Sequence, residues 1–397
     1  MAARKPRESG AWILAAAISK TVYSENNLKH ESLNKGSWES VAEAARPPRP
    51  ERVRPIIIIG AGGIVSAAHL PAYAKAGFPV LALMDTAPGK AAELAKRTGV
   101  ANSFTSVIEA AGFASPDAVF DVAVPASKIL GVLSQLPDGV AVLIQKPMGE
   151  TLAEATEIRD LCRRKSLVAA VNFQLRYAPF NLAARAIAAR GLLGEWHDFE
   201  AQVRTYTPWH LWTFLATAPR LEILYHSIHY LDLIRSWFGN PRGIYAKTVR
   251  HPSYPNLAAT KSVMILDYGD SKRVFVATNH GHDYGEAQQR SFVLWEGTEG
   301  SMRATLGVNL DYPKGKPDSL DYIHRSEMKN GWQSCPIRGN WFPDAFVGSM
   351  GALQAYVEGS ISELPSHFED AYQTMALVEA AYLSSARQTE MIPLEGN

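Results

Sequence analysis

Short, uninterrupted apolar runs recur through the first half of the chain, with a helix-like segment between most of them. Strands buried on both faces of a parallel sheet have this pattern, because neither face meets water. The runs lie at residues 55–60, 78–85, 117–125, 140–147 and 166–174. Helical character marks residues 90–99 and 149–165 instead. The alternation predicts an α/β fold with a doubly wound parallel sheet.

From about residue 180 the apolar segments become longer, more aromatic and partly alternating with polar residues. Such alternation is typical of strands that have one solvated face. The segments lie at residues 195–207, 244–251, 260–281 and 290–305. Turn sequences such as DYGDSKRV and EGTEGS lie between paired strands. The second half is therefore predicted to be an α+β domain with an open, largely antiparallel sheet.

Proline and arginine concentrate in ARPPRPERVRP, which cannot continue a helix. Residues 1–52 are therefore expected to form an N-terminal arm and linker. The first α/β domain should cover 53–176 and the α+β domain 177–365. Residues 366–397 hold an amphipathic helix that we expect to pack back on the first domain.

The charge balance of the 397-residue chain gives little attraction for polyanions. Forty basic and 39 acidic residues leave a net charge of +1, so neither nucleic acid nor an anionic membrane is an expected partner. Two cysteines are too few for a disulfide framework, which predicts a cytoplasmic protein. The basic and then apolar start, residues 1–18, loosely resembles a secretory signal. No clear small-x-small cleavage site follows it, so an arm is favoured.

Three glycines, Gly60, Gly62 and Gly63, follow the first apolar run directly. Glycine allows a tight strand-to-helix turn, and a bare backbone lets a pyrophosphate approach the N–H groups of the next helix. Asp85 ends the second run, where a carboxylate binds ribose hydroxyls and repels a 2′-phosphate. The pattern predicts bound NAD, with NADP as the alternative, although Val65 stands where a third glycine or alanine is usual.

A lysine and a histidine-bearing helix are the other notable features. Lys146 follows the fourth apolar run, at the strand end where ligands of open α/β sheets lie, although a solvated strand end is the other interpretation. Residues 221–241 predict a helix that ends near Gly239. At 100° per residue, four of its polar side chains share an arc of about 100°: Glu222, Tyr225, His226 and His229.

Two other interpretations of this helix remain open. The four groups could hydrogen-bond one another between the domains. Alternatively, Glu222, His226 and His229 could bind a metal ion for hydrolysis or elimination. The second interpretation leaves Lys146 and Asp85 without a role, so we expect no metal.

Four motifs in this order resemble the Gfo/Idh/MocA oxidoreductase family. They are IIIIGAGGIVSAAHLPAY, VAVP at 122–125, QKPMGETLAEA at 145–155 and HSIHYLDLIRSWFG at 226–239. The resemblance implies a Rossmann domain joined to an open-sheet domain. It also implies hydride transfer between a nicotinamide cofactor and a small sugar-like or cyclitol substrate. A homodimer or homotetramer formed through the open sheet is expected, because an apolar sheet face usually pairs with a copy of itself.

The resemblance also implies roles for individual residues. Lys146 would lie beside nicotinamide and substrate, and His229 would be the general base. Ile64, Pro125 and Gln145 join the expected cofactor site.

The chain departs from the family pattern at two positions. Gln145 replaces the usual glutamate, and Tyr225 replaces an aspartate four residues before His229. Tyr225 is expected to relay a proton if the Lys146 ammonium lowers the pKa of its phenol.

Three further side chains are candidates for substrate binding: Arg176, Trp209 and His226. Arg176 would clamp a hydroxyl pair or a carboxylate, with a structural salt bridge as the equal alternative. Trp209 would form a floor for a sugar ring or pack internally, and His69 is expected to be structural. The competing function is a regulator that holds NAD without turnover, an interpretation that Tyr225 keeps open.

Overall fold

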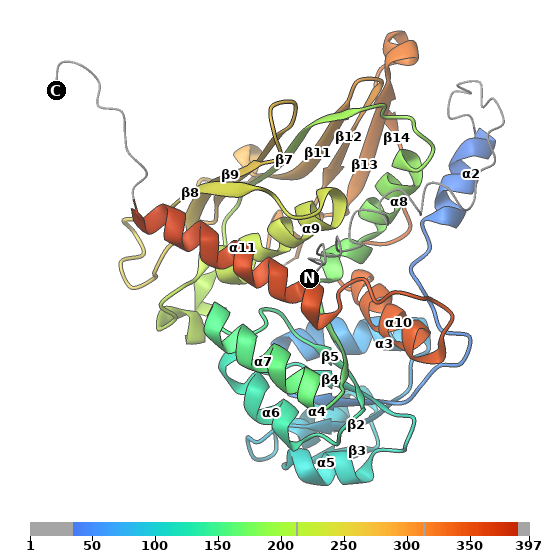
Figure 1. The fold of residues 1–397 in the computed structure, drawn as a ribbon, viewed down its shortest axis with the longest axis vertical. Coiled ribbons are helices and arrows are strands. Elements are labelled where there is room, and N and C mark those ends of the chain that lie inside the picture. The colour runs from blue at the N-terminus through green and yellow to red at the C-terminus, as the bar shows by residue number, and fades with distance from the viewer. Residues whose placement is uncertain (1–34, 212, 313, 388–397) are drawn as a thin grey trace, which may run out of the picture.

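The computed structural model describes residues 35–211, 213–312 and 314–387 and contains two sheets, each covered by helices (Figure 1). Within these ranges, six parallel strands form the first sheet in the order β3-β2-β1-β4-β5-β6. Their bounds are β1 Ile56–Ile59, β2 Val80–Met84, β3 Asn102–Phe104, β4 Val119–Val122, β5 Ala141–Ile144 and β6 Val168–Val171. The predicted doubly wound parallel sheet is therefore confirmed.

Helices join these strands and cover both faces of the sheet, as the predicted alternation requires. They are α3 Leu70–Ala76, α4 Lys90–Thr98, α5 Val107–Phe113, α6 Ile129–Gln135 and α7 Leu152–Arg164. A π-helical turn, η2 (Val65–His69), comes directly before α3. Strand β3 was not predicted, because its three residues lie at the sheet edge and carry no apolar run.

Eight strands of the described chain form the second sheet, in the order β14-β13-β12-β11-β7-β10-β9-β8. Their bounds are β7 Trp196–Arg204, β8 Gly243–Val249, β9 Lys261–Asp267, β10 Arg273–Asn279, β11 Arg290–Gly297, β12 Gly300–Thr305, β13 Ser319–His324 and β14 Gln333–Ser334. β7 and β10 run parallel and the other neighbours antiparallel. The predicted, largely antiparallel sheet is confirmed.

One face of the second sheet is covered by helices α8 (Pro179–Ala188) and α9 (Ile228–Phe238) (Figure 1). Burial alternates along β9, where Met264 and Leu266 point inward and Ile265 is 52% exposed. Tyr245 on β8 is 61% exposed on the same outer side. The sheet thus has one buried and one open face, as its sequence pattern predicted.

Three helices do not follow the predicted boundaries between the parts of the chain. Helix α2 (Lys35–Ala44) contacts α8, and α10 (Ala345–Glu358) contacts α3, β5 and β6 of the Rossmann sheet. Helix α11 (Phe368–Arg387) contacts α7 on one side and α9 and β8 on the other (Figure 1). The segment predicted as the second domain, 177–365, therefore includes a helix of the Rossmann core, and α11 packs on both parts.

His69 is fully buried beneath the glycine loop, as expected for a structural residue. Its Nδ1 lies 2.6 Å from Asp121 Oδ2, and the Tyr73 hydroxyl donates to the same oxygen at 2.7 Å. The ring of Phe346 from α10 lies 4.9 Å from the His69 ring. This cluster fixes η2 against β4 and α10.

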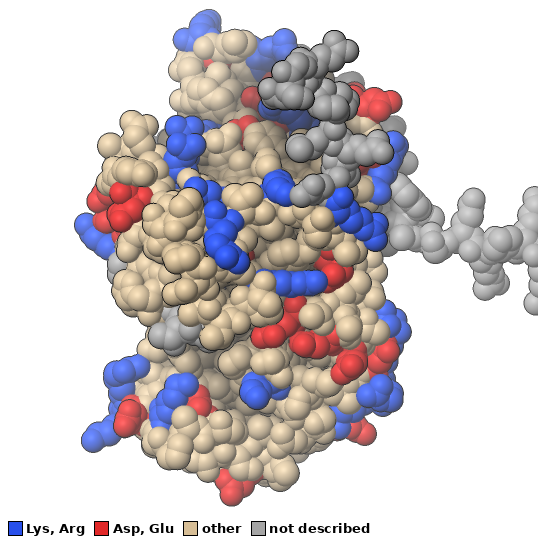
Figure 2. Space-filling view, turned by 90° about the vertical axis from the view of Figure 1, so that its left-hand side faces the viewer, with Lys and Arg blue, Asp and Glu red and all other residues tan. Residues whose placement is uncertain are grey.

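No helix in the described ranges combines the length and apolar character that spanning a bilayer demands. The face shown in Figure 2 carries basic and acidic side chains interspersed, in keeping with the near-zero net charge.

Candidate active site

The glycine loop combines a close backbone approach with open space. Gly60 has φ +108°, and a Cβ there would lie 2.3 Å from the Ala123 carbonyl oxygen of the neighbouring strand connection. A Cβ on Gly62 or Gly63 would meet no atom within 4 Å. The space beside these two glycines is therefore unfilled by described residues, which suits a pyrophosphate at the start of the following helix.

Asp85 lies at the carboxyl end of β2, beside the glycine loop. Its carboxylate accepts hydrogen bonds from the N–H groups of Ala61 (2.9 Å) and Ala87 (3.0 Å) and pairs with Lys90 at 2.9 Å. Burial alone would raise the pKa of Asp85, but these donors and the Lys90 ammonium lower it. The carboxylate is thus ionised and positioned at the expected ribose end, although Lys90 reduces its repulsion of a 2′-phosphate.

The remaining expected cofactor residues share one edge of the sheet. Ile64 immediately precedes η2 after β1, Pro125 follows β4, and Gln145 and Lys146 follow β5. Because β1, β4 and β5 are neighbours, their carboxyl ends bring these residues side by side. The Gln145 N–H donates to Val122 O at 2.9 Å, while its buried side-chain oxygen accepts no hydrogen bond from the described chain.

Lys146 reaches from the Rossmann sheet to the histidine-bearing helix. Its ammonium donates to the Tyr225 main-chain carbonyl at 2.8 Å. Burial lowers the pKa of Lys146 to about 8, and no described carboxylate forms an ion pair with it. A neutral Gln145 at the neighbouring position leaves this depression uncompensated.

His229 lies on α9 and is 7% exposed. Its ring meets Trp341 edge-on at 5.4 Å, and its Nδ1 makes no hydrogen bond to any described residue. Burial, and then the charge of Lys146, hold the pKa of His229 well below its usual range. A neutral imidazole keeps a nitrogen lone pair that can accept a proton.

The condition for a proton relay at Tyr225, a phenol pKa lowered by Lys146, is not met. A π-helical turn, η7 (Ile223–Ser227), precedes α9, so the angular spacing of a regular α-helix does not hold there. The Tyr225 hydroxyl is hydrogen-bonded to Glu150, and burial together with that carboxylate raises the pKa of Tyr225 to about 12. Lys146 contacts the main chain of this residue and does not lower the pKa of its phenol.

His226 lies within an aromatic and acidic cluster beside Lys146. Its ring is 4.4 Å from that of His280 and 5.2 Å from that of Trp209. Glu222 Oε1 lies 3.4 Å from His280 Nε2 and accepts a hydrogen bond from Ser227 at 2.7 Å. Glu222 thus pairs with His280, and no group of the described residues is arranged to hold a metal ion.

Arg176 has its donors occupied within the protein. Its guanidinium binds both carboxylate oxygens of Asp232, at 2.7 and 2.6 Å, and contacts Asp370 at 2.6 Å. It also donates to the Pro365 carbonyl. This arrangement is the structural salt bridge that the sequence left as the alternative to substrate binding.

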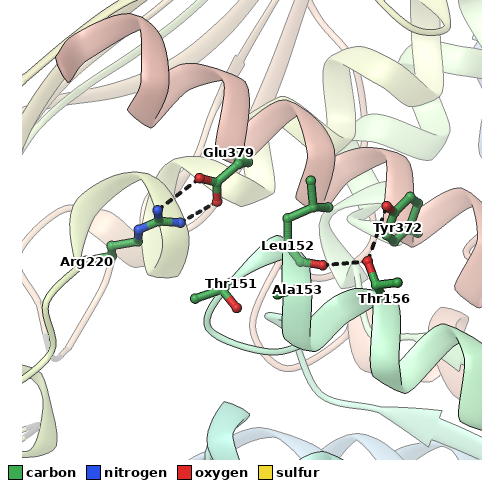
Figure 3. Close-up of a pocket in the computed structure, with 7 residues that line it drawn as sticks. All are labelled: Thr151, Leu152, Ala153, Thr156, Arg220, Tyr372 and Glu379. Carbon is green, nitrogen blue, oxygen red and sulfur yellow. Dashed lines mark hydrogen bonds and ion pairs between the residues drawn. The ribbon is translucent and has the colours of Figure 1, made fainter. Parts of the chain in front are cut away.

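A separate cavity of about 410 Å³ lies at the junction of α7 and α11 (Figure 3). Arg220 and Glu379 form an ion pair at 2.5 Å across one wall, and Thr156 donates to the Tyr372 hydroxyl at 3.3 Å on the other. The polar side chains here bind one another, so these contacts hold the two parts of the chain together.

Sequence reasoning missed three residues that border the candidate site: Glu150, His280 and Trp341. His280 directly follows β10, which runs parallel to β7. Its place at the end of a strand was the one feature of the sequence that could have indicated a site residue. Glu150 and Trp341 lie in irregular segments whose contacts have no local pattern.

The structure joins a Rossmann sheet that carries an open glycine loop to a second, mostly antiparallel sheet. Residues 54–173 match the oxidoreductase family with an NAD-binding Rossmann fold, and residues 181–303 match the Gfo/Idh/MocA C-terminal domain. The chain belongs to the Gfo/Idh/MocA family, and NAD as the cofactor class is confirmed.

Two curated relatives and one solved structure illustrate the likeness. The chain is 29% identical to 1,5-anhydro-D-fructose reductase of Ensifer adhaerens over 45% of its length and 54% of that protein. It is 24% identical to D-apiose dehydrogenase of Paraburkholderia graminis over 65% of this chain and 68% of that protein. An oxidoreductase from Agrobacterium radiobacter was solved with NAD+, L-tartaric acid and magnesium. Its TM-score is 0.71 at 18% identity, and the superposition covers 85% of this chain and 98% of that protein. The match therefore spans about half of the reductase.

Proposed function

We propose that this protein is an NAD(P)-dependent dehydrogenase or reductase acting on a sugar, sugar acid or cyclitol. It would transfer hydride between nicotinamide and a secondary alcohol or ketone. The observation that carries the proposal is the burial of Lys146 next to the histidine helix, at the sheet edge that also presents the open glycine loop. The sugar-acting names of the two curated relatives support the substrate class.

Lys146 and His229 have complementary protonation states for this reaction. When bound, NAD supplies the carbon that accepts or returns hydride. In oxidation, the neutral His229 imidazole takes the hydroxyl proton as hydride leaves the carbinol carbon and a C=O bond forms. The Lys146 ammonium stabilises the negative charge that develops on the substrate oxygen.

Trp209 and His226 would form the substrate side of the site. A cavity of about 440 Å³ lies against Trp209, and its wall also contains Tyr206, Tyr254 and Asn256. Aromatic faces with amide and hydroxyl groups suit a sugar, which has an apolar face and a polar rim. The cavity walls carry no lysine or arginine among the described residues, so an uncharged ligand fits better than a phosphorylated one.

The test is cofactor binding followed by turnover. We expect NADH fluorescence to increase on binding, with a tighter complex than for NADPH because of Asp85. A panel of aldoses, sugar acids and inositols should then include compounds that reduce NAD+. Tight NADH binding without turnover of any of these, together with a Lys146→Ala variant that binds identically, would instead support the NAD-holding regulator.

We also propose that the outer face of β8 and β9 pairs with a second copy of the chain. Tyr245, Val263 and Ile265 are 61, 47 and 52% exposed there, and the first and last lie opposite each other on paired strands. Ile265→Asp should convert a dimer or tetramer into smaller species by light scattering, whereas exposed Ile108→Asp on α5 should not. A wild-type monomer would refute this assembly. A cytoplasmic location remains a prediction from the cysteine usage.

A further inference from the structure

We propose that Glu222, acting through His280, is a positioning residue that orients His226 beside Lys146. This inference rests on the proposed function. It gives a role to the Glu222–His280 pair, which lies outside the 226–239 motif. The argument depends on the burial of Glu222, its partners and the stacking of the two imidazoles.

Glu222 is fully buried and still ionised. Burial raises its pKa, but the facing His280 ring and the hydroxyls of Ser262 and Ser227 lower it below the ordinary value. His280 is the basic side chain of the described residues that pairs with it. A buried carboxylate with one basic partner must share charge with that partner, because an unpaired buried anion is strongly unfavourable.

His280 is held in a fixed orientation between Glu222 and His226. One ring nitrogen faces Glu222 at 3.4 Å, and the other lies 3.1 Å from the Thr207 hydroxyl. The ring stacks on His226 at 4.4 Å with an interplanar angle of 30°. Trp209 meets both imidazoles edge-on, at 5.2 and 5.9 Å. The stack therefore leaves His226 little freedom to rotate.

The charges around His226 explain why an anion is needed. Burial, His280, Lys146 and His229 all act to lower the pKa of His226. No carboxylate appears among the groups that shift its pKa. The other titratable groups that face Glu222 are the phenols of Tyr230 and Tyr382. Glu222 therefore reaches His226 only through the His280 ring, which it faces at 3.4 Å and which stacks on His226 at 4.4 Å.

The first test is the pH dependence of kcat/KM in a Glu222→Gln variant. Removing the anion disfavours protonated groups nearby, so both limbs of the profile should move to lower pH by roughly half a unit. The value of kcat should fall about tenfold. Glu222→Asp, which retains the charge, should return the limbs close to their wild-type positions.

Asp232→Asn is the matched control, because Asp232 is also a buried carboxylate of the same helix but pairs with Arg176. It should lower the melting temperature and leave both limbs in place. If Glu222→Gln lowers the melting temperature with unmoved limbs, Glu222 is merely structural and the proposal is overturned.

A second measurement separates this inference from the proposed function, because it needs no turnover. Histidine side chains are titrated by NMR in the ¹⁵N-histidine-labelled full chain, with the signals of interest assigned from His226→Asn and His280→Gln variants. Glu222→Gln should shift the midpoints of both signals, and Asp232→Asn should not. Unchanged midpoints in Glu222→Gln would overturn the inference even if the enzyme reduces NAD+.

Discussion

Replacing Lys146 with methionine should lower kcat by roughly 10²- to 10⁴-fold, the contribution expected of a group that handles charge at the reacting centre. Methionine has a similar length and no charge, so it fills the same buried space and removes the donor to Tyr225 O. NADH affinity and the melting temperature should change little. Stopped-flow measurement of hydride transfer, alongside NADH titration, checks both expectations.

The same lysine predicts an alkaline limit to activity. Since burial lowers the pKa of Lys146 to about 8, its ammonium is lost as pH rises through that value, and kcat/KM should fall there. Lys146→Arg keeps the charge to much higher pH and should move the limb upward, at reduced rate. His229→Asn should remove the acid limb instead. A wild-type profile that stays flat between about pH 7 and pH 10 would contradict the role of Lys146.

Gly60→Ala should prevent the Rossmann domain from folding, or destabilise it by about 3 kcal/mol or more. The backbone there has φ +108°, which alanine adopts only with strain, and its Cβ would lie 2.3 Å from the Ala123 carbonyl oxygen. Backbone atoms of two adjacent strand ends cannot move apart without breaking the sheet. Circular dichroism melting of the purified variant measures this loss.

Gly62→Ala is the control for this variant, because a Cβ there meets no described atom within 4 Å. It should melt close to wild type and yet bind NADH more weakly, since the methyl group enters the space that the pyrophosphate would occupy. Equal melting temperatures for the two alanine variants would show that the close contact at Gly60 does not limit the stability of the fold.

The Rossmann strands could be predicted because burial on both faces leaves an uninterrupted apolar run. Ile56–Ile59 and Ala141–Ile144 are fully or almost fully buried, so no polar position interrupts them. β3 lacks that signal because it is a short edge strand. The glycine loop and Asp85 could also be placed, since their spacing follows from one strand–helix–strand unit.

The environment of the histidine helix could not be predicted from helical spacing. The π-helical turn at Ile223–Ser227 alters the angular relation between Tyr225 and His229, and nothing in the local sequence announces it. Glu222 finds its partner in His280, 58 positions further along the chain, through the packing of the helix on the second sheet. Such contacts are set by tertiary structure.

Arg176 illustrates the same limit in a different way. A single arginine after a strand fits a substrate clamp or a salt bridge equally well. The decision depends on Asp232 and Asp370, which lie 56 and 194 residues away and are brought near by α9 and α11. Sequence could therefore name the residue but not its partner.

The packing of α10 has a consequence for how the protein is made. Phe346, Met350 and Leu353 share a buried cluster with Ile56 and Ile58. A chain that ends at residue 176 contains every Rossmann strand but leaves that apolar surface uncovered. The dinucleotide domain can therefore mature only once translation has passed residue 353, so a gene fragment for 53–176 should yield aggregating polypeptide.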